Sequence, residues 1–195
     1  MSTAKKSSRA EPRRIYQLHV ALDEIQPKIW RRLWVADTLT LAKLDRVIQA
    51  AMGWTNSHLH EFKIAGKRYA IPDDEWPDDD PTSDDRRSRV GSVLADNVNE
   101  FSYLYDFGDC WQHTVKVEKL LEPSEINTRP TCLGGQNACP PEDVGGSRGY
   151  MEFLEAVLDP SHEEHIAMWC WAGGPFDPTG FDVNATNAAI RKLRF

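Results

Sequence analysis

The sequence predicts an α+β fold: a mixed sheet with a β-grasp-like N-terminal part, and a helical C-terminal part packed on it. Three observations lead to this prediction. Short segments of alternating apolar and polar residues fill the first part of the chain, and a single amphipathic helical stripe interrupts them. Helical spacing of apolar residues dominates after residue 149. A hairpin, then a helix, then more strands is the order expected when one helix covers one face of a mixed sheet.

The chain opens with two strands, one helix and a second hairpin. Alternation predicts the strands, and an apolar stripe that begins after the N-cap candidate Thr40 and ends at Gly53 predicts the helix. His60, Phe62 and Ile64 fall on one face of their strand. The predicted ranges are 15–22 and 29–35 for the first hairpin, 41–52 for the helix, and 59–64 and 67–71 for the second hairpin.

The segment 101–121 is the densest aromatic stretch and predicts the hairpin that anchors the sheet. Its turn is placed at Gly108 and Asp109. One strand is expected to direct Phe101, Tyr103, Tyr105 and Phe107 to a common face, and the return strand does the same for Trp111, His113, Val115 and Val117.

Loops and helices are predicted for the last third of the chain. Segment 123–147 is rich in proline and glycine and is expected to be a long loop. A helix follows at about 150–158, and Ser161 with Glu164 is the pattern of a capping box that starts another helix. That second helix is expected to bury Ile166, Met168, Trp169 and Trp171, and a short helix ends near Leu193.

Charge and composition define the remaining segments and the compartment. We expect residues 1–13 to form a disordered basic tail, residues 14–195 a single domain, and residues 72–89 a mobile acidic surface loop. The net charge of −7 argues against duplex binding by the whole surface. The basic tail is expected to be a solubilising segment, with nucleic-acid contact as the alternative. No apolar run is long enough for a membrane span, so a cytoplasmic protein is expected, with its four cysteines as thiols or metal ligands.

Three histidines are the first candidate site. His58 and His60 share one side of an extended segment, and His113 lies on the apolar side of the central hairpin, where Asp106 or Asp109 can orient a ring. One interpretation is a core imidazole satisfied by a carboxylate or carbonyl. The other is a catalytic set for a metal-dependent hydrolase, made of His58, His60, Asp109 and His113.

A zinc site is the second candidate. Cys132, Cys139, His162 and His165 supply ligands that zinc prefers, but their spacing lacks paired Cys-x-x-Cys knuckles. The alternative is that Cys132 packs as a small hydrophobic residue and that both histidines decorate the first turn of a helix.

An anion site is the third candidate. Gly145, Gly146, Ser147 and Arg148 lead into a helix, where free N–H groups and the arginine can hold a phosphate or carboxylate. In the alternative, this loop binds a carboxylate of the protein itself, from Glu142 or Asp143.

Five stretches together resemble one known family, the plasmid pRiA4b ORF-3-like family. They are IQPKIWRRLWV (25–35), MGWTNSHLHEF (52–62), YDFGDCWQH (105–113), CPPEDVGGSRGY (139–150) and FDPTGFD (176–182). The resemblance covers nearly everything from Ile15 onward. It implies a bacterial or archaeal protein often met on plasmids and mobile elements, and it supplies no reaction, ligand or catalytic residue.

The function expected from all this is that of a binding or accessory protein linked to mobile elements, with an unknown protein or small-molecule ligand. A metal-dependent hydrolase is the alternative. Some members of the family carry the label of a transposon resolvase. We reject that activity because Ser57 and Ser147 lack the supporting arginines, and the sequence shows no helix-turn-helix with a basic recognition helix.

Overall fold

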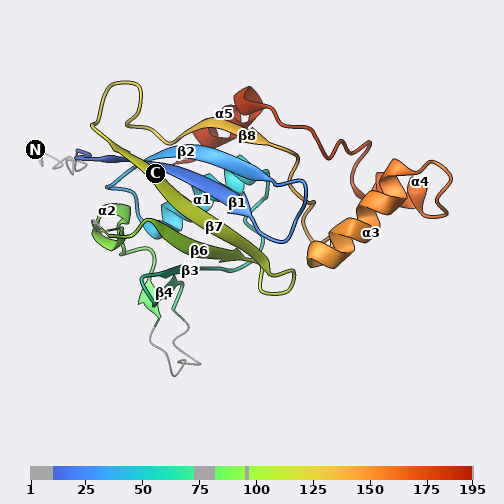
Figure 1. Ribbon diagram of the computed structural model, residues 1–195, viewed down its shortest axis with the longest axis horizontal. Coiled ribbons are helices and arrows are strands. Elements are labelled where there is room, and N and C mark those ends of the chain that lie inside the picture. The colour runs from blue at the N-terminus through green and yellow to red at the C-terminus, as the bar shows by residue number, and fades with distance from the viewer. Residues whose placement is uncertain (1–10, 73–81, 95–96, 195) are drawn as a thin grey trace, which may run out of the picture.

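The computed structural model describes residues 11–72, 82–94 and 97–194, and its central feature is one eight-stranded sheet (Figure 1). The strands lie side by side in the order β5-β4-β3-β6-β7-β1-β2-β8. Neighbours run antiparallel except β4 and β5, which run parallel. Their bounds are β1 Ile15–Leu22, β2 Trp30–Ala36, β3 His60–Ile64, β4 Lys67–Ala70, β5 Ser83–Asp84, β6 Glu100–Tyr105, β7 Trp111–Leu121 and β8 Thr131–Gln136.

The helices of the described residues form two pairs and one separate turn (Figure 1). Helix α1 (Leu41–Met52) packs beside α5 (Val183–Lys192) behind the sheet, and α5 also contacts β8. Helices α3 (Gly146–Leu158) and α4 (His165–Trp171) project beyond the sheet as a separate pair, and the single turn α2 (Val90–Val93) precedes β6. None of these helices combines the length and the apolar character that a bilayer crossing requires.

Helix α1 forms where its sequence pattern predicts. Its apolar stripe, which includes Leu44, Val47 and Ile48, is fully buried against the sheet. The helix ends at Gly53, whose φ of 103° is open to glycine at little cost and whose N–H donates to the carbonyl oxygen of Gln49. Thr40 stands at the N-cap as predicted, but its side chain makes no capping hydrogen bond.

The central hairpin is confirmed, with a longer turn than predicted. Tyr103, Tyr105, Trp111 and His113 are all buried on the helix-covered face. The turn spans residues 106–110, because Asp106 and Cys110 both have positive φ and the N–H of Cys110 donates to the Asp106 carbonyl oxygen at 2.7 Å. Phe107 was expected on the buried face. It lies in this turn instead and is 49% exposed.

The α+β class and the mixed sheet are confirmed, whereas the β-grasp-like N-terminal part is not shown. The first hairpin, β1 with β2, does not adjoin the second, β3 with β4, because β6 and β7 lie between them. This order depends on pairings between distant segments, and the alternation of residues within each strand does not encode them. Segment 123–147 is likewise more than a loop, since β8 within it pairs with β2.

Helix α4 differs from its prediction in start and orientation. The capping box is absent, because the N–H and hydroxyl of Ser161 both donate to Asp159 Oδ1 and Glu164 is the N-cap. His165 is the buried residue of the helix. Ile166, which was expected inside, is 67% exposed, and Trp171 is 48% exposed.

Part of the predicted acidic loop is anchored in the core. Residues 73–81 lie outside the described residues, but Asp85 is fully buried and its Oδ2 lies 2.9 Å from Nε2 of His60. The N–H of Asp85 donates to the carbonyl oxygen of Ala70. The prediction of a mobile surface loop is therefore wrong for the end of this segment. The tail prediction concerns mainly residues 1–10, which also lie outside the described part, while the N–H of Arg13 donates to the carboxylate of Asp37.

Candidate metal centre

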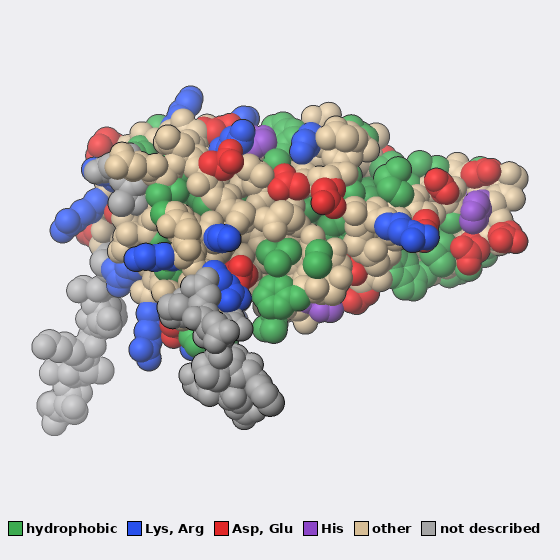
Figure 2. All heavy atoms as spheres, turned by 60° about the horizontal axis from the view of Figure 1, so that its bottom comes forward, with side chains coloured by type: hydrophobic (Ala, Val, Ile, Leu, Met, Phe, Trp, Pro, Cys, Tyr) green, Lys and Arg blue, Asp and Glu red, His purple; other side chains and the backbone are tan. Residues whose placement is uncertain are grey.

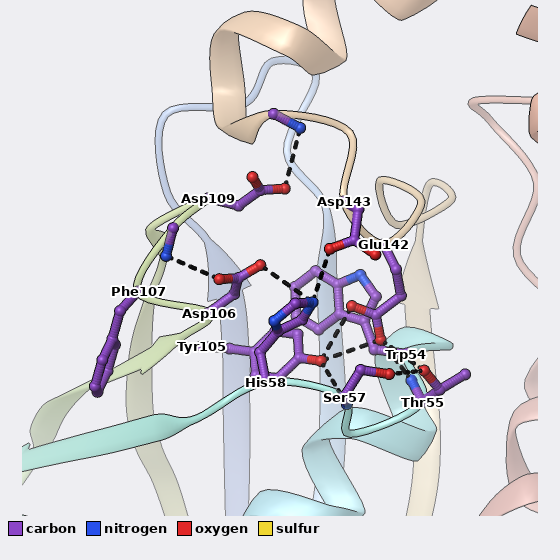
Figure 3. A network of polar contacts seen from close by, with 12 residues as sticks. Trp54, Thr55, Ser57, His58, Tyr105, Asp106, Phe107, Asp109, Glu142 and Asp143 are labelled. Carbon is purple, nitrogen blue, oxygen red and sulfur yellow. Dashed lines mark hydrogen bonds and ion pairs between the residues drawn. The ribbon is translucent and has the colours of Figure 1, made fainter.

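Three segments that are far apart in the sequence meet at one end of the central hairpin (Figure 3). His58 comes from the segment before β3, Asp106 from the turn after β6, and Asp143 from the loop before α3. Nε2 of His58 lies 2.9 Å from Oδ1 of Asp143 and 3.6 Å from Oδ2 of Asp106. One ligand atom of each residue lies within 4.8 Å of the other two.

The backbone fixes the position of Asp106. Its φ of 57° turns the chain, its N–H donates to the carbonyl oxygen of Leu59, and its Oδ1 accepts the N–H of Gly108 at 2.8 Å. Asparagine and aspartate tolerate this left-handed conformation because their side chains bond the nearby backbone. The side chain is only 9% exposed, and Oδ2 is left facing the ring of His58.

Glu142, beside Asp143, fastens the loop that carries the third ligand. Its Oε1 accepts hydrogen bonds from the N–H and the hydroxyl of Thr55 at 2.7 and 3.0 Å. The hydroxyl of Tyr105 donates to the same carboxylate at 3.0 and 3.1 Å. Burial and the negative charge of Glu142 raise the pKa of Tyr105 well above its usual range, so this hydroxyl stays a donor. Trp54 adds a further tie from its indole N–H to the Pro140 carbonyl oxygen.

The imidazole nitrogen at the centre of the cluster is buried and lacks a hydrogen bond with the described part of the chain. Nε2 of His58 is close to both carboxylates, but neither contact has hydrogen-bond geometry. One imidazole nitrogen and two carboxylate oxygens are ligands that Zn²⁺ and Mn²⁺ accept, at roughly 2.0–2.2 Å for zinc. The two negative charges also favour a divalent cation at this point.

The predicted catalytic set does not converge. Only His58 lies in the cluster, while the buried ring of His60 sits between Asp45 Oδ1 at 3.3 Å and Asp85 Oδ2 at 2.9 Å. Burial lowers the pKa of His60, but the hydrogen bond with Asp85 and the charges of both carboxylates outweigh burial, so the pKa is raised.

His113 is the core imidazole of the first interpretation. It is fully buried, and its Nδ1 is placed 3.3 Å from the Tyr103 carbonyl oxygen, to which it donates. Burial lowers the pKa of His113 to about 4. The ring of Tyr103 contacts both His113 and His60, with centroid distances of 5.2 and 6.1 Å, so it separates the two histidines.

Asp109 binds the start of α3, which is the segment predicted to form the anion site. Its Oδ2 accepts the N–H of Gly145 at 3.1 Å at the start of α3. A carboxylate of the protein therefore occupies this helix start, as the alternative interpretation expects, but it comes from Asp109 and not from Glu142 or Asp143. Gly146 packs so closely on the Asp109 backbone that an added Cβ would lie 2.7 Å from its carbonyl oxygen. The other two predicted residues bond elsewhere, Ser147 to Glu24 at 3.2 Å and Arg148 to Glu152 at 2.9 Å.

The predicted zinc ligands do not form a metal-ligand group within the described ranges. Cys132 is buried, and burial raises its pKa, as it raises the pKa of Cys139 to about 12. Nδ1 of His165 donates to the carbonyl oxygen of Ala156 at 2.9 Å, and Nδ1 of His162 accepts the N–H of Glu164. This arrangement agrees with the alternative prediction that Cys132 packs as a small hydrophobic residue.

Sequence reasoning found one of the three clustered ligands. Asp106 was considered only as a partner that orients a histidine ring, and Asp143 only as a carboxylate for its own loop. A usable signal was present, because three of the five stretches that carry the family resemblance supply one ligand each: MGWTNSHLHEF, YDFGDCWQH and CPPEDVGGSRGY.

Comparison with known proteins identifies the family. Residues 14–185 match the family described as Plasmid pRiA4b ORF-3-like protein. The uncharacterized protein y4hQ of Sinorhizobium fredii is 41% identical over 180 residues, which are 92% of each chain. The crystal structure of a protein of unknown function, MM3350 from Methanosarcina mazei Go1, matches with a TM-score of 0.80 and 35% identity over 89% of this chain and 96% of that one. The chain belongs to the plasmid pRiA4b ORF-3-like family.

Proposed function

We propose that the protein is a non-enzymatic binding protein that holds a divalent cation, Zn²⁺ or Mn²⁺, through His58, Asp106 and Asp143. The observation that carries the proposal is the convergence of one imidazole nitrogen and two carboxylates within 4.8 Å, with the nitrogen buried and without a hydrogen bond in the described chain. A cation would give that nitrogen a partner and offset the repulsion between the carboxylates.

The ligand of the binding protein would be an anionic group that completes the coordination of the cation. Three protein ligands leave coordination positions open, and the Asp143 side chain is 69% exposed, so the cluster is accessible from that side. A carboxylate or phosphate of a small molecule or a partner protein has the chemistry to fill such a position.

The hydrogen bonds of the neighbouring carboxylates favour a binding function over hydrolysis. Glu142 and Asp109 border the cluster, and both already accept hydrogen bonds that fix loops, from Thr55 and Tyr105 in one case and from Gly145 in the other. These hydrogen bonds stabilise the ionised carboxylates and hold them in their loops, which makes both weaker bases for a metal-bound water. A metal-dependent hydrolase stays the second candidate, because three ligands with an open position are also typical of catalytic zinc sites. It would use His58, without His60 or His113.

Calorimetric titration of chelator-treated protein with Zn²⁺ and Mn²⁺ tests the proposal. We expect one site per chain, and we expect His58→Gln and Asp143→Asn each to weaken binding at least about tenfold. Matched controls are His162→Gln and Asp159→Asn, which change the same residue types outside the cluster and should bind like the wild type. Equal binding by the His58 and His162 variants would refute the site.

A panel of phosphoester, peptide and amide substrates separates the two candidates. The binding-protein proposal expects no turnover by the metal-loaded wild type. Turnover that disappears in His58→Gln but persists in His162→Gln would establish the hydrolase instead.

The cellular setting is part of the same proposal. The description of the matching family names a plasmid reading frame, and this wording supports an accessory role for plasmids and mobile elements. All four cysteines are free thiols, which supports a reducing compartment such as the cytoplasm.

A further inference from the structure

Helices α3 and α4 form an arm that extends past the end of the sheet (Figure 1). The arm and the loop leading into it carry a large excess of negative charge. In Figure 2 the narrow end of the molecule, made by this arm, shows acidic side chains next to hydrophobic ones. Segment 142–171 contains one arginine, Arg148, and seven carboxylates: Glu142, Asp143, Glu152, Glu155, Asp159, Glu163 and Glu164.

A groove of about 260 Å³, the arm groove, runs between the two helices of the arm. On α3 its lining residues are Gly149, Glu152 and Phe153. The other side is lined by Glu164, the N-cap of α4, and by Met168 and Trp171 within α4. These spacings of three and four residues put each set on one helix face. Asp143 and Val144 complete the lining at the base of the arm.

The groove combines an apolar floor with an acidic rim. Phe153 and Trp171 meet edge to face at a centroid distance of 5.8 Å, and Trp171 remains 48% exposed. Glu164 has an exposed side chain on one rim. On the other rim, Glu152 is held by Arg148 at 2.9 Å. An exposed indole and a thioether beside carboxylates suit a group that is both apolar and positively charged.

We propose that the arm groove is a docking site for a basic amphipathic peptide segment of a partner protein. A lysine or arginine of the peptide would lay its aliphatic stem on Trp171 and Met168 and direct its charge to Glu164. Apolar neighbours in the peptide would pack on the exposed ring of Trp171. The charge of the arm would speed encounter with such a segment and disfavour acidic ones.

The size of the groove supports a peptide over a cofactor. Small-molecule pockets usually measure roughly 300–1,000 Å³, and this groove is smaller and open along the arm. It accommodates one or two side chains of a longer segment that continues over the exposed surface. The proposal goes beyond the cation site and does not depend on it, although Asp143 borders both.

Fluorescence anisotropy with two labelled peptides tests the proposal: an amphipathic helical peptide of leucine and lysine, and its counterpart with glutamate in place of lysine. The measurement is made in the presence of a chelator, so that failure of the cation site does not affect it. We expect the lysine peptide to bind and the glutamate peptide not to bind. Glu164→Lys and Trp171→Ala should each weaken binding at least about tenfold.

Glu163→Lys is the matched control, because it makes the same charge change one residue away and outside the groove lining. It should leave the affinity within about threefold of the wild type. The proposal is overturned if neither peptide binds, or if Glu163→Lys and Glu164→Lys weaken binding equally. It is also overturned if spermidine binds as tightly as the peptide, or if the groove is filled by a second copy, seen as self-association that Glu164→Lys abolishes.

Discussion

Replacing His113 by asparagine should abolish a large part of the acid sensitivity of the fold. The His113 ring is fully buried and nearly perpendicular to the Trp54 ring at a centroid distance of 5.5 Å, and its Nε2 has no hydrogen bond with the described chain. A proton on this ring would place a charge in an apolar core without a counter-charge. Burial accordingly lowers the pKa of His113 to about 4.

The size of the effect follows from the difference between this pKa and that of the unfolded chain. An unfolded histidine has a pKa of about 6.5, so the unfolded chain takes up the proton first as the pH falls. The contribution of His113 to stability is therefore fully present above pH 6.5 and is lost between about pH 6.5 and 4. A difference of about 2.5 pKa units corresponds to about 3 kcal/mol of unfolding free energy.

Urea unfolding of wild type and His113→Asn at several pH values from about 7.5 to 4 measures this loss. The asparagine amide reproduces the Nδ1 donor to the Tyr103 carbonyl oxygen and does not titrate, but it leaves a cavity where the ring was. At neutral pH we expect the variant to be less stable by roughly 1–3 kcal/mol. The wild type should lose this advantage by about pH 4, so that the two stability curves meet or cross.

Parallel curves for wild type and His113→Asn would refute the reasoning, because they would show that the ring is solvated or charged in the folded protein. His162→Asn is the control, since its half-buried ring lies outside the core. It should run parallel to the wild type over the whole range.

Three further predictions concern stability. Trp111→Ala should cost roughly 3–5 kcal/mol in urea unfolding, because the ring is 2% exposed, whereas Phe107→Ala in the turn should cost less than about 1 kcal/mol. Asp85→Asn should lower the pKa of His60 in an NMR titration, because the ring loses its partner carboxylate. Protonated His60 stabilises the wild type below pH 6.5, and this contribution is lost as the pH rises through the raised pKa of His60. The variant should show a smaller contribution of this kind. Arg31→Met should lower the free energy of urea unfolding by about 2 kcal/mol or more, because the Arg31 guanidinium donates to four carbonyl oxygens. An unchanged unfolding midpoint for Trp111→Ala or Arg31→Met, or an unshifted His60 titration, would contradict the respective prediction.

Local sequence patterns were sufficient to locate most elements of the fold. The stripe of α1, the glycine that ends it and the alternation in β6 and β7 are properties of neighbouring residues. The order of the strands was not predictable in this way, because it depends on which distant segments pair. Strand β8 was missed because Gly134 and Gly135 give it no alternation, and a register shift opposite Arg32 and Leu33 interrupts its pairing.

In the candidate site, too, local sequence patterns identified one residue but not the distant residues that lie beside it in the fold. His58 was identified because it shares one side of an extended segment with His60. Asp106 was considered only as a residue that orients a histidine ring, and Asp143 was not connected with His58, because both approach it through loops that are each turned by an aspartate with positive φ. Asp85 was included in the predicted acidic surface loop for a comparable reason, since its burial depends on pairing with His60 across the fold.

Anomalous diffraction from crystals soaked in Zn²⁺, and separately in Mn²⁺, tests the central claim most directly. We predict one strong anomalous peak per chain between Nε2 of His58, Oδ2 of Asp106 and Oδ1 of Asp143, at roughly 2.0–2.2 Å from each ligand atom in the zinc crystal, and no such peak in Asp106→Asn crystals. A strong peak at Cys132, Cys139, His162 or His165 instead, or no peak at His58 under conditions that load other divalent-metal proteins, would contradict the account.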